Sequence, residues 1–276
     1  MSKRRKEPQN RLTGKAAKAD KYALYQDAVQ CPEAEIEFFD RAYRENYASE
    51  PKILREDFCG AGAVSCQWVK TGDTRKAYGI DLDPEPLAWG MAHNVSTLST
   101  EQRERLKFIE GNVLSAKSPK ADVLAAQNFS FFIFKTREEV VDYFRKAHAN
   151  IAAKGVMVID MFGGSESYLE DHLERRKYDG FKYVWEQARF DPVTHHCTFY
   201  IHFTFKDGSK LDKAFRYDWR LWSIPEVREM LAEAGFSRSD VYWEGTDDDG
   251  EGNGEYELVE SAPSDPAWVA YIVGVK

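Results

Sequence analysis

The sequence predicts an α/β protein with a doubly wound, mostly parallel sheet of seven strands and an antiparallel β insertion after the fifth strand. Strand-like and helix-like segments alternate over residues 51–164, which is typical of parallel strands joined by helices. The segment 156–164 is nearly all apolar, as expected for a strand covered on both faces. Residues 165–222 then alternate with a period of two, which indicates antiparallel strands.

The individual elements follow in chain order. Apolar residues at helical spacing in 21–46 predict two helices, separated at Pro32. The five strands of the alternating region are expected at 51–58, 76–83, 105–113, 121–129 and 156–164. The helices between them are expected at 62–72, 84–98 and 136–155. Ser223 is a favourable N-cap for a last helix at 223–236, and Gly235 ends it.

The C-terminal third completes the sheet. The insertion is expected to hold three antiparallel strands, "FKYVWEQARF", "HHCTFYIHFTF" and "KLDKAFRYDWRLW", joined by the turns "DPVT" and "KDGS". Two closing strands, "SRSDVYWEG" and "AWVAYIVGVK", bring the main sheet to seven. The acidic stretch 246–266 between them is expected to be a solvated loop.

Charge is distributed unevenly along the chain. The formal net charge is −8, but residues 1–21 hold eight basic and two acidic side chains, so they contribute +6 and the remainder carries −14. An acidic body is a poor platform for nucleic acid, because phosphate contacts need clustered cations. Residues 1–20 are expected to be a disordered basic tail, with residues 21–276 forming the folded domain.

The cysteines and the apolar runs indicate the compartment. The four cysteines form no C-x-x-C pair, which favours reduced thiols. No window approaches 18 apolar residues, and the N-terminus has no apolar segment of a secretory signal. We expect an intracellular, cytoplasmic protein without a membrane partner.

A glycine turn follows the first strand. "ILREDFCGAGAVS" runs from Ile53 to Ser65 and places Glu56 just before Gly60-Ala61-Gly62. Turns of this kind present free backbone N–H groups at a helix N-terminus to an anionic group. A carboxylate at the strand end would repel a pyrophosphate, so the stretch favours a ligand that carries a positive amino group as well.

The turn resembles the first motif of the class I methyltransferases that use S-adenosylmethionine (SAM), "(D/E)-x-G-x-G-x-G", with Phe58 in place of the first glycine. "GIDLDPEPLAWGMA" resembles the second motif, and "EGNV" stands where the family usually has Gly-Asp. "AAQNFSFFIF", "AKGVMVIDMF", "EMLAEAGFS" and "YIVGVK" match later elements in the same order. The resemblance covers roughly residues 50–165 and 223–276.

The resemblance implies SAM as cofactor and S-adenosylhomocysteine as product. It implies that Glu56 accepts from the ammonium group, that Asp81 binds the ribose hydroxyls and that Leu82 packs on adenine. Asn112 would accept from the adenine amine. The implied cofactor-binding residues are Tyr25, Glu56, Gly60, Ala61, Gly62, Asp81, Leu82, Asn112, Val113 and Asn128. Taken singly, Glu56 is also explained as a surface charge, Asp81 as a helix N-terminal acid and Asn112 as a turn former.

The acceptor is constrained mainly by exclusion. "QNFS" at 127–130 lacks the Asn/Asp-Pro-Pro-aromatic stretch of amino-methylating DNA enzymes, and no Pro-Cys nucleophile is present. Small-molecule members of the family often cover their active site with an antiparallel insertion, which residues 165–222 resemble. The candidate substrate residues are Tyr22, Tyr200, Arg216, Trp219 and Arg220. An alternative is that the two arginines pair with surface acids and that the tryptophans are core.

These observations predict methyl transfer to nitrogen or oxygen of a small molecule by in-line displacement. The catalytic residues and the oligomeric state stay undetermined. Three rival functions remain: an RNA or protein methyltransferase using the basic tail, a SAM-binding protein without catalysis, and an NAD(P)-dependent oxidoreductase. No metal site is expected, because His195 and His196 point to opposite faces of a strand and "DDDGEGNGEYEL" lacks the final glutamate of a calcium loop.

Overall fold

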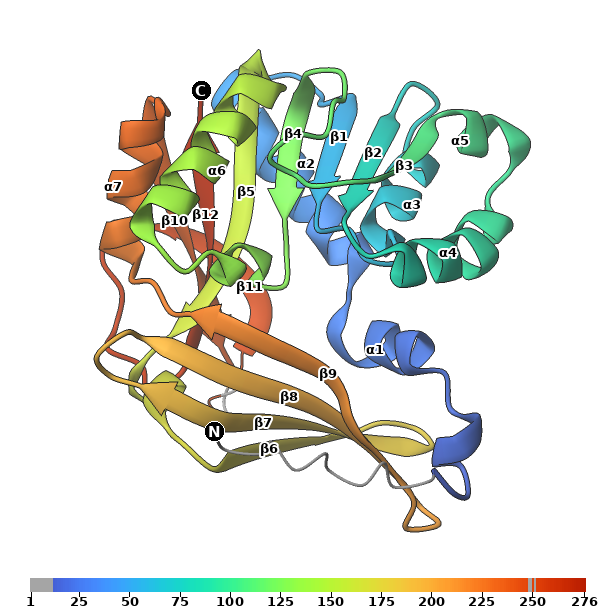
Figure 1. The fold of residues 1–276 in the computed structure, drawn as a ribbon. Coiled ribbons are helices and arrows are strands. Elements are labelled where there is room, and N and C mark those ends of the chain that lie inside the picture. Colours follow the sequence, from blue (N-terminus) through green and yellow to red (C-terminus); the bar gives the residue numbers. More distant parts are fainter. Residues whose placement is uncertain (1–11, 248–249, 251) are drawn as a thin grey trace, which may run out of the picture.

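The structure, a computed structural model, describes residues 12–247, 250 and 252–276. Within this part of the chain, eight strands form one large sheet in the order β11-β10-β12-β5-β4-β1-β2-β3 (Figure 1). The pairs from β5 to β3 are parallel, while β12, β10 and β11 add in antiparallel fashion. The strands are β1 Ile53–Asp57, β2 Lys76–Asp81, β3 Leu106–Glu110, β4 Ala121–Ala126, β5 Ile151–Gly163, β10 Arg238–Thr246, β11 Gly252–Val259 and β12 Trp268–Val275.

Helices cover both faces of this sheet. One face packs against α2 and α3, and the opposite face packs against α6 and α7. The longer helices are α1 Lys21–Val29, α2 Pro32–Tyr47, α3 Ala63–Lys70, α4 Pro84–His93, α6 Arg137–Asn150 and α7 Ile224–Ala234, with a short α5 at Thr100–Glu104. Short 3-10 turns occur at η1 Ala16–Lys18, η2 Val95–Thr97, η3 Ser130–Ile133 and η4 Ser165–Tyr168. The doubly wound α/β fold is therefore confirmed.

The insertion forms a second, antiparallel sheet of four strands in the described chain, ordered β6-β7-β8-β9. Its strands are β6 His172–Lys177, β7 Phe181–Asp191, β8 His196–Phe205 and β9 Lys210–Arg220. In Figure 1 the parallel strands of the large sheet run toward α1 and this small sheet. The carboxyl ends of β1, β2 and β4 therefore face the space that α1 and the insertion border.

Two sequence predictions about the strands need correction. The main sheet has an eighth strand, β11, within residues 246–266, which were expected to be a loop. The strand was missed because Tyr256 and Leu258 are its only large apolar residues before Val259, and glycines and acids surround them. The insertion has a fourth strand, β6, which was missed because its sequence "HLERRK" is mostly charged and shows no alternation of apolar and polar residues. Both strands lie at a sheet edge, where a strand needs few apolar residues.

The expected tail of residues 1–20 lies only partly within the described residues, since residues 1–11 are outside them. Residues 12–20 do follow a defined course, contrary to the expectation for that part. Ala16 is buried, and the backbone N–H groups of Lys15 and Ala16 donate to Asp207 and Ser209 in the β8–β9 turn (2.8 and 3.1 Å). This contact joins the N-terminal segment to the insertion.

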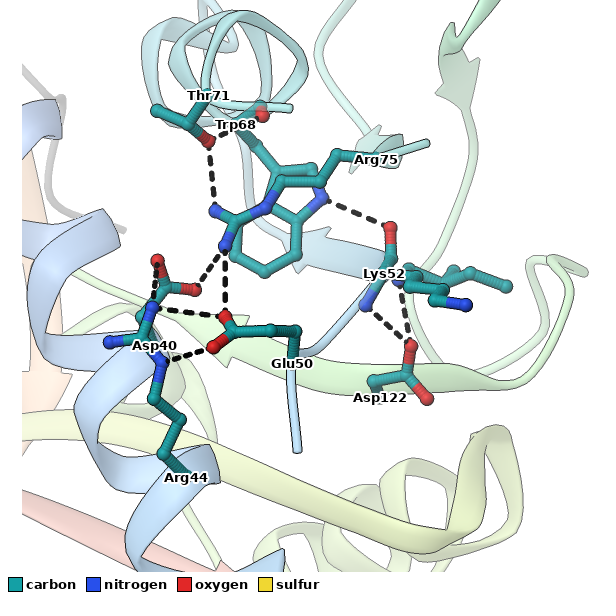
Figure 2. Close-up of polar contacts among 9 residues, drawn as sticks. Asp40, Arg44, Glu50, Lys52, Trp68, Thr71, Arg75 and Asp122 are labelled. Carbon is teal, nitrogen blue, oxygen red and sulfur yellow. Dashed lines mark hydrogen bonds and ion pairs between the residues drawn. The ribbon is translucent and has the colours of Figure 1, made fainter. Parts of the chain in front are cut away.

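A network of hydrogen bonds and ion pairs surrounds the amino end of β1 (Figure 2). The guanidinium of Arg75 donates to Asp40 of α2 (2.6 Å) and to Thr71 (2.8 Å), and it lies 4.2 Å from the ring centre of Trp68. The backbone N–H groups of Lys52 and Ile53 donate to the carboxylate of Asp122 (2.8 and 2.9 Å). These contacts hold α2, α3 and β1 together at the edge opposite the glycine turn. Among the described residues, none of the helices has both the length and the apolar character needed to cross a membrane.

Candidate functional site

The glycine turn keeps its tight backbone path although Phe58 replaces a glycine. Phe58, Gly60 and Gly62 all have positive φ (60°, 53° and 65°), and Gly62 is the N-cap of α3. The ring of Phe58 packs against Phe134 and Tyr143, with ring centres 6.2 and 5.7 Å away. A left-handed conformation is unfavourable for a residue with a Cβ, so this packing offsets a local strain.

Asp81 is tied to the glycine turn. Its carboxylate lies at the carboxyl end of β2 and accepts from the backbone N–H of Gly60 (2.7 Å) and of Asp83 (2.9 Å). Burial raises the pKa of Asp81, while the two N–H donors oppose that effect. A carboxylate oxygen can accept more than one hydrogen bond, so Asp81 is fixed in place and can still bind a hydroxyl.

A cavity of about 560 Å³ opens beside Asp81 at the ends of β2 and β3. This volume lies within the usual range of small-molecule sites. Four residues predicted from the sequence line it together: Asp81, Leu82, Asn112 and Val113. The remaining lining residues are Phe58, Asp83, Pro84, Gly111, Ile133 and Phe134. The cavity thus combines a few polar groups with a mostly apolar lining.

Asn112 has a structural role in its own loop. Its side-chain oxygen accepts from the backbone N–H of Leu114 (2.9 Å), and its carbonyl accepts from Ser115 and Ala116. This is the turn-forming role that the sequence left open. Because the residue also lines the cavity, the turn positions it where a ligand can contact it.

Glu56 is not a surface charge, because only 4% of it is exposed. One carboxylate oxygen accepts from both the backbone N–H and the hydroxyl of Ser65 (2.9 and 2.5 Å). Burial raises the pKa of Glu56 to about 7, against the effect of these two hydrogen bonds. Ser65, the residue at the third glycine position of a dinucleotide motif, therefore holds the carboxylate.

Asp160 was not predicted from the sequence. It lies near the carboxyl end of β5, and its two oxygens accept from the backbone N–H groups of Asn128 and Phe129 (2.9 and 2.8 Å). Both of these residues have positive φ, so Asp160 stabilises a strained turn after β4. Burial raises its pKa to about 7. The only available signal was an acid inside an otherwise apolar strand.

Helix α1 is linked to the glycine turn through the side chain of Asn94, which follows α4. The side chain of Asn94 donates to Gln26 of α1 (2.6 Å) and to the carbonyl of Ala61 (2.9 Å). Asp20 caps α1 and accepts from the indole of Trp89 (2.6 Å). These contacts bring α1 close to the turn, and sequence reasoning did not identify Gln26 or Asn94.

The two tyrosines of α1 face the insertion. Tyr25 packs on Phe215 of β9 with ring centres 5.0 Å apart, and its hydroxyl lies near that of Tyr217. Burial raises the pKa of both hydroxyls, so each is neutral at physiological pH. Tyr22 lies between Trp89 and Phe215, at 5.7 and 5.9 Å. Tyr25 therefore joins α1 to β9, whereas Tyr22 also contacts Trp89 of α4.

The five candidate substrate residues are not brought together. Tyr200 and Arg216 are a cross-strand pair on one face of the small sheet, where Arg216 is bound to the exposed carboxylate of Asp218 (2.8 Å). Arg220 donates to the carbonyl of Lys135 (2.9 Å) and lies over Trp222, while Trp219 is buried in the core. Alternation along β9 explains the position of Trp219, since its side chain points to the face opposite that of Arg216 and Arg220.

Comparison with known proteins shows the fold. No family model matches the chain, and no curated protein matches its sequence. The solved structures with a similar fold include a SAM-dependent methyltransferase from Clostridium acetobutylicum, with a TM-score of 0.65, 15% identity and coverage of 91% of this chain and 96% of that one. The sugar N-methyltransferase KedS8 from Streptoalloteichus matches with a TM-score of 0.64, 17% identity and coverage of 100% and 98%.

A third match is CalS10 from Micromonospora echinaspora, a SAM-bound amino pentose methyltransferase, with a TM-score of 0.61, 15% identity and coverage of 91% and 95%. All three likenesses extend over nearly the whole of both chains, so they include the insertion as well as the large sheet. The chain therefore has the fold of the class I SAM-dependent methyltransferases.

Proposed function

We propose that this protein is a methyltransferase that moves a methyl group from SAM to nitrogen or oxygen of a small-molecule acceptor. The observation that carries the proposal is the cavity at the ends of β2 and β3, where Asp81, Leu82, Asn112 and Val113 converge. It lies beside a glycine turn with a buried carboxylate, Glu56. The fold of solved methyltransferases supports the same function.

The residues present match the parts of SAM. Asp81 would accept from the ribose hydroxyls, and Leu82 and Val113 would contact the adenine ring beside Asn112. A Cβ built at Gly60 meets nothing within 4 Å, so the turn leaves room for a ligand there. Glu56 would accept from the ammonium group. A nucleoside half therefore belongs over β2 and β3, and an amino-acid half over β1.

When bound, SAM would supply an electrophilic methyl group on a sulfonium, whose departure leaves a neutral thioether. The protein's task is then to position the acceptor and exclude water. Helix α1 contributes to this, because Asn94 fastens it to the carbonyl of Ala61. A basic side chain is required only if the acceptor arrives protonated.

The insertion, residues 165–222, is proposed to cover the acceptor site. Its inner face is aromatic: Trp185, Phe199 and Tyr217 pack on one another with ring centres 4.9–5.9 Å apart. The Tyr25–Tyr217 hydroxyl pair lies where α1 meets this face. Two solved relatives of the fold are named for sugar N-methylation and amino pentose methylation, which supports a small hydroxylated amine as acceptor.

Binding of the cofactor tests the proposal directly. Isothermal titration of the full chain should show binding of SAM and S-adenosylhomocysteine, and no comparable binding of NAD(H). Asp81→Asn should weaken both at least about tenfold, because hydrogen bonds to a charged acceptor contribute on the order of 1.5–3 kcal/mol. Asp73→Asn is the matched control, since Asp73 is exposed in the turn before β2 and should change nothing.

The acceptor class is tested separately, by release of S-adenosylhomocysteine from SAM with panels of sugars and amino sugars. Turnover with a member of these panels supports a small-molecule acceptor. If instead only RNA or protein is methylated, and deletion of residues 1–20 removes that activity, the small-molecule proposal is wrong. If the wild-type protein binds NAD(H) tightly and neither SAM nor its product, the methyltransferase proposal itself is wrong.

A further inference from the structure

Glu35 in the first turns of α2 is a buried carboxylate without a cation. Only 8% of the residue is exposed, and no ion pair within the described residues includes it. The side-chain oxygen Oε2 of Glu35 is buried and has no hydrogen-bond partner in the described chain. A buried, unpaired carboxylate is costly, so packing alone does not explain its presence.

The helix dipole is an insufficient explanation. Acidic residues near a helix N-terminus are stabilising, and Glu33 supplies such a charge from an exposed position. Glu35 points instead to the buried side of α2, with Ile36 and Phe39 as buried neighbours along the helix. An exposed acid would give the same dipole interaction without the cost of desolvation.

The groups that act on Glu35 identify the place it faces. After burial, the charges of Glu56 and then Asp160 have the largest effects, and both raise its pKa well above the ordinary value. The charge of Glu35 in turn raises the pKa of the hydroxyls of Tyr25, Tyr256 and Tyr271.

Glu35 lies in the first turn of α2, which begins at Pro32 directly after α1, and Asn94 joins α1 to the glycine turn through Gln26 and the carbonyl of Ala61. Glu35 is therefore on the side of the sheet where β1 and the glycine turn meet.

The carboxylates of Glu35, Glu56 and Asp160 differ in how many of their oxygens accept hydrogen bonds. Asp160 accepts from two backbone N–H groups through its two oxygens, so it is committed to the turn after β4. Glu56 uses one oxygen for Ser65, and Glu35 has one oxygen without a partner. No arginine, lysine or histidine of the described chain forms an ion pair with any of the three. Glu35 and Glu56 therefore border a region where no cationic side chain compensates their charged forms, which is why burial raises the pKa of both.

The order of strands says which part of a ligand belongs there. Along the carboxyl edge, β3 and β2 carry Asn112 and Asp81, and β1 comes next with Glu56. A nucleoside over β2 and β3 thus directs an attached amino acid toward β1 and Glu56, the acid whose charge acts most strongly on Glu35 of α2.

We propose that Glu35 is a second carboxylate for the α-ammonium group of SAM, which would lie between Glu35 and Glu56; this inference rests on the proposed function. An ammonium has three N–H donors and can serve both acids. Its charge would balance the site, and the cost of burying Glu35 would be recovered when the cofactor binds.

Two ligands separate this role from a structural one. S-adenosylhomocysteine has the amino-acid group, whereas 5′-methylthioadenosine is the corresponding nucleoside thioether without it. Titration of the full chain with both is expected to show that Glu35→Gln weakens S-adenosylhomocysteine binding about 10- to 100-fold and changes methylthioadenosine binding less than about twofold. Glu37→Gln, the same change at an exposed position of the same helix, should affect neither.

Thermal unfolding without ligand provides a second readout. Glu35→Gln should melt no lower than the wild type, because it replaces a buried acid whose charged form is disfavoured by a neutral side chain of the same shape. A lower Tm together with equal weakening of both ligands would mean that Glu35 is structural and would overturn the inference. Unchanged binding of both ligands would overturn it as well, while leaving the methyltransferase proposal intact. If wild-type protein binds neither ligand, the proposed function fails first.

Discussion

Phe58 shows how a single residue can depart from a motif without changing the backbone. Its φ of 60° is the conformation that the missing glycine would adopt, at a cost of roughly 1–2 kcal/mol for a residue with a Cβ. The ring compensates by packing against Phe134 and Tyr143 and by forming part of the cavity wall. A sequence pattern based on glycine alone misses such an exchange.

Gly90 is required for the close approach of α4 to the glycine turn. A Cβ at this position would lie 2.2 Å from the carbonyl oxygen of Ala61. Gly90→Ala should therefore lower Tm by several degrees and weaken S-adenosylhomocysteine binding, although alanine is the better helix former by about 1 kcal/mol. Differential scanning calorimetry and isothermal titration measure the two effects.

Gly111→Ala is the matched control for stability, because its Cβ would have no neighbour closer than 3.9 Å, at Ala116. Its Tm should stay within a degree or two of the wild type. A Gly90→Ala protein as stable as this control would show that α4 can shift freely and that the close contact is dispensable.

At the scale of elements, the network in Figure 2 positions β1 from the end opposite the site. Arg75 is 7% exposed and lies between Asp40 and the Trp68 ring, so its partners are largely desolvated. Glu50, by contrast, binds Arg44 with its side chain 60% exposed. The network therefore has a buried half, which contributes to stability, and an exposed half, which contributes little.

Asp40→Asn should destabilise the protein by about 1–3 kcal/mol, because it removes the nearer of the two carboxylates around the buried Arg75, at 2.6 Å against 3.9 Å for Glu50. For a chain of this size, this corresponds to a fall in Tm of several degrees. Glu50→Gln, at the exposed half, should cost no more than about 0.5 kcal/mol. Both variants should bind S-adenosylhomocysteine like the wild type, since the network lies at the amino end of β1. Weakened binding in either variant would contradict the separation of the two ends.

At the scale of the whole molecule, buried acids gather at the carboxyl edge of the large sheet. Burial raises the pKa of Glu56 and of Asp160 to about 7, from ordinary values near 4. Between these values, the folded protein holds protons that the unfolded chain has released. Each group therefore destabilises the fold as the pH rises from about 4 to about 7.

The wild-type protein without ligand should consequently lose more stability between pH 5 and pH 8 than Glu56→Gln does. One pKa unit corresponds to about 1.4 kcal/mol, so the difference in Tm should amount to a few degrees. His148, whose pKa is lowered by burial, has the opposite slope in both proteins and cancels in the comparison. Parallel curves of Tm against pH for the two proteins would show that Glu56 is ionised in the empty site.

Most of the fold was predictable because its signals are local. The parallel strands are apolar runs, and the capping residue Ser223 marks a helix start that the structure confirms. The edge strands β6 and β11 escaped prediction, because an edge strand is exposed and needs no apolar pattern. Pairing with a neighbouring strand, which sequence spacing does not reveal, determines both.

The sequence by itself determined the order of the motifs, and therefore which strand ends meet at one edge of the sheet. This order was sufficient to predict that Asp81 and Asn112 lie at the same site. Only the tertiary structure decided which further side chains reach this edge. Glu35, Asp160 and Asn94 come from three separate elements, and the arginines of β9 point elsewhere. The reason is physical. The order of motifs is a property of the sequence, whereas the burial of a side chain and the absence of a counter-charge depend on how distant segments pack together.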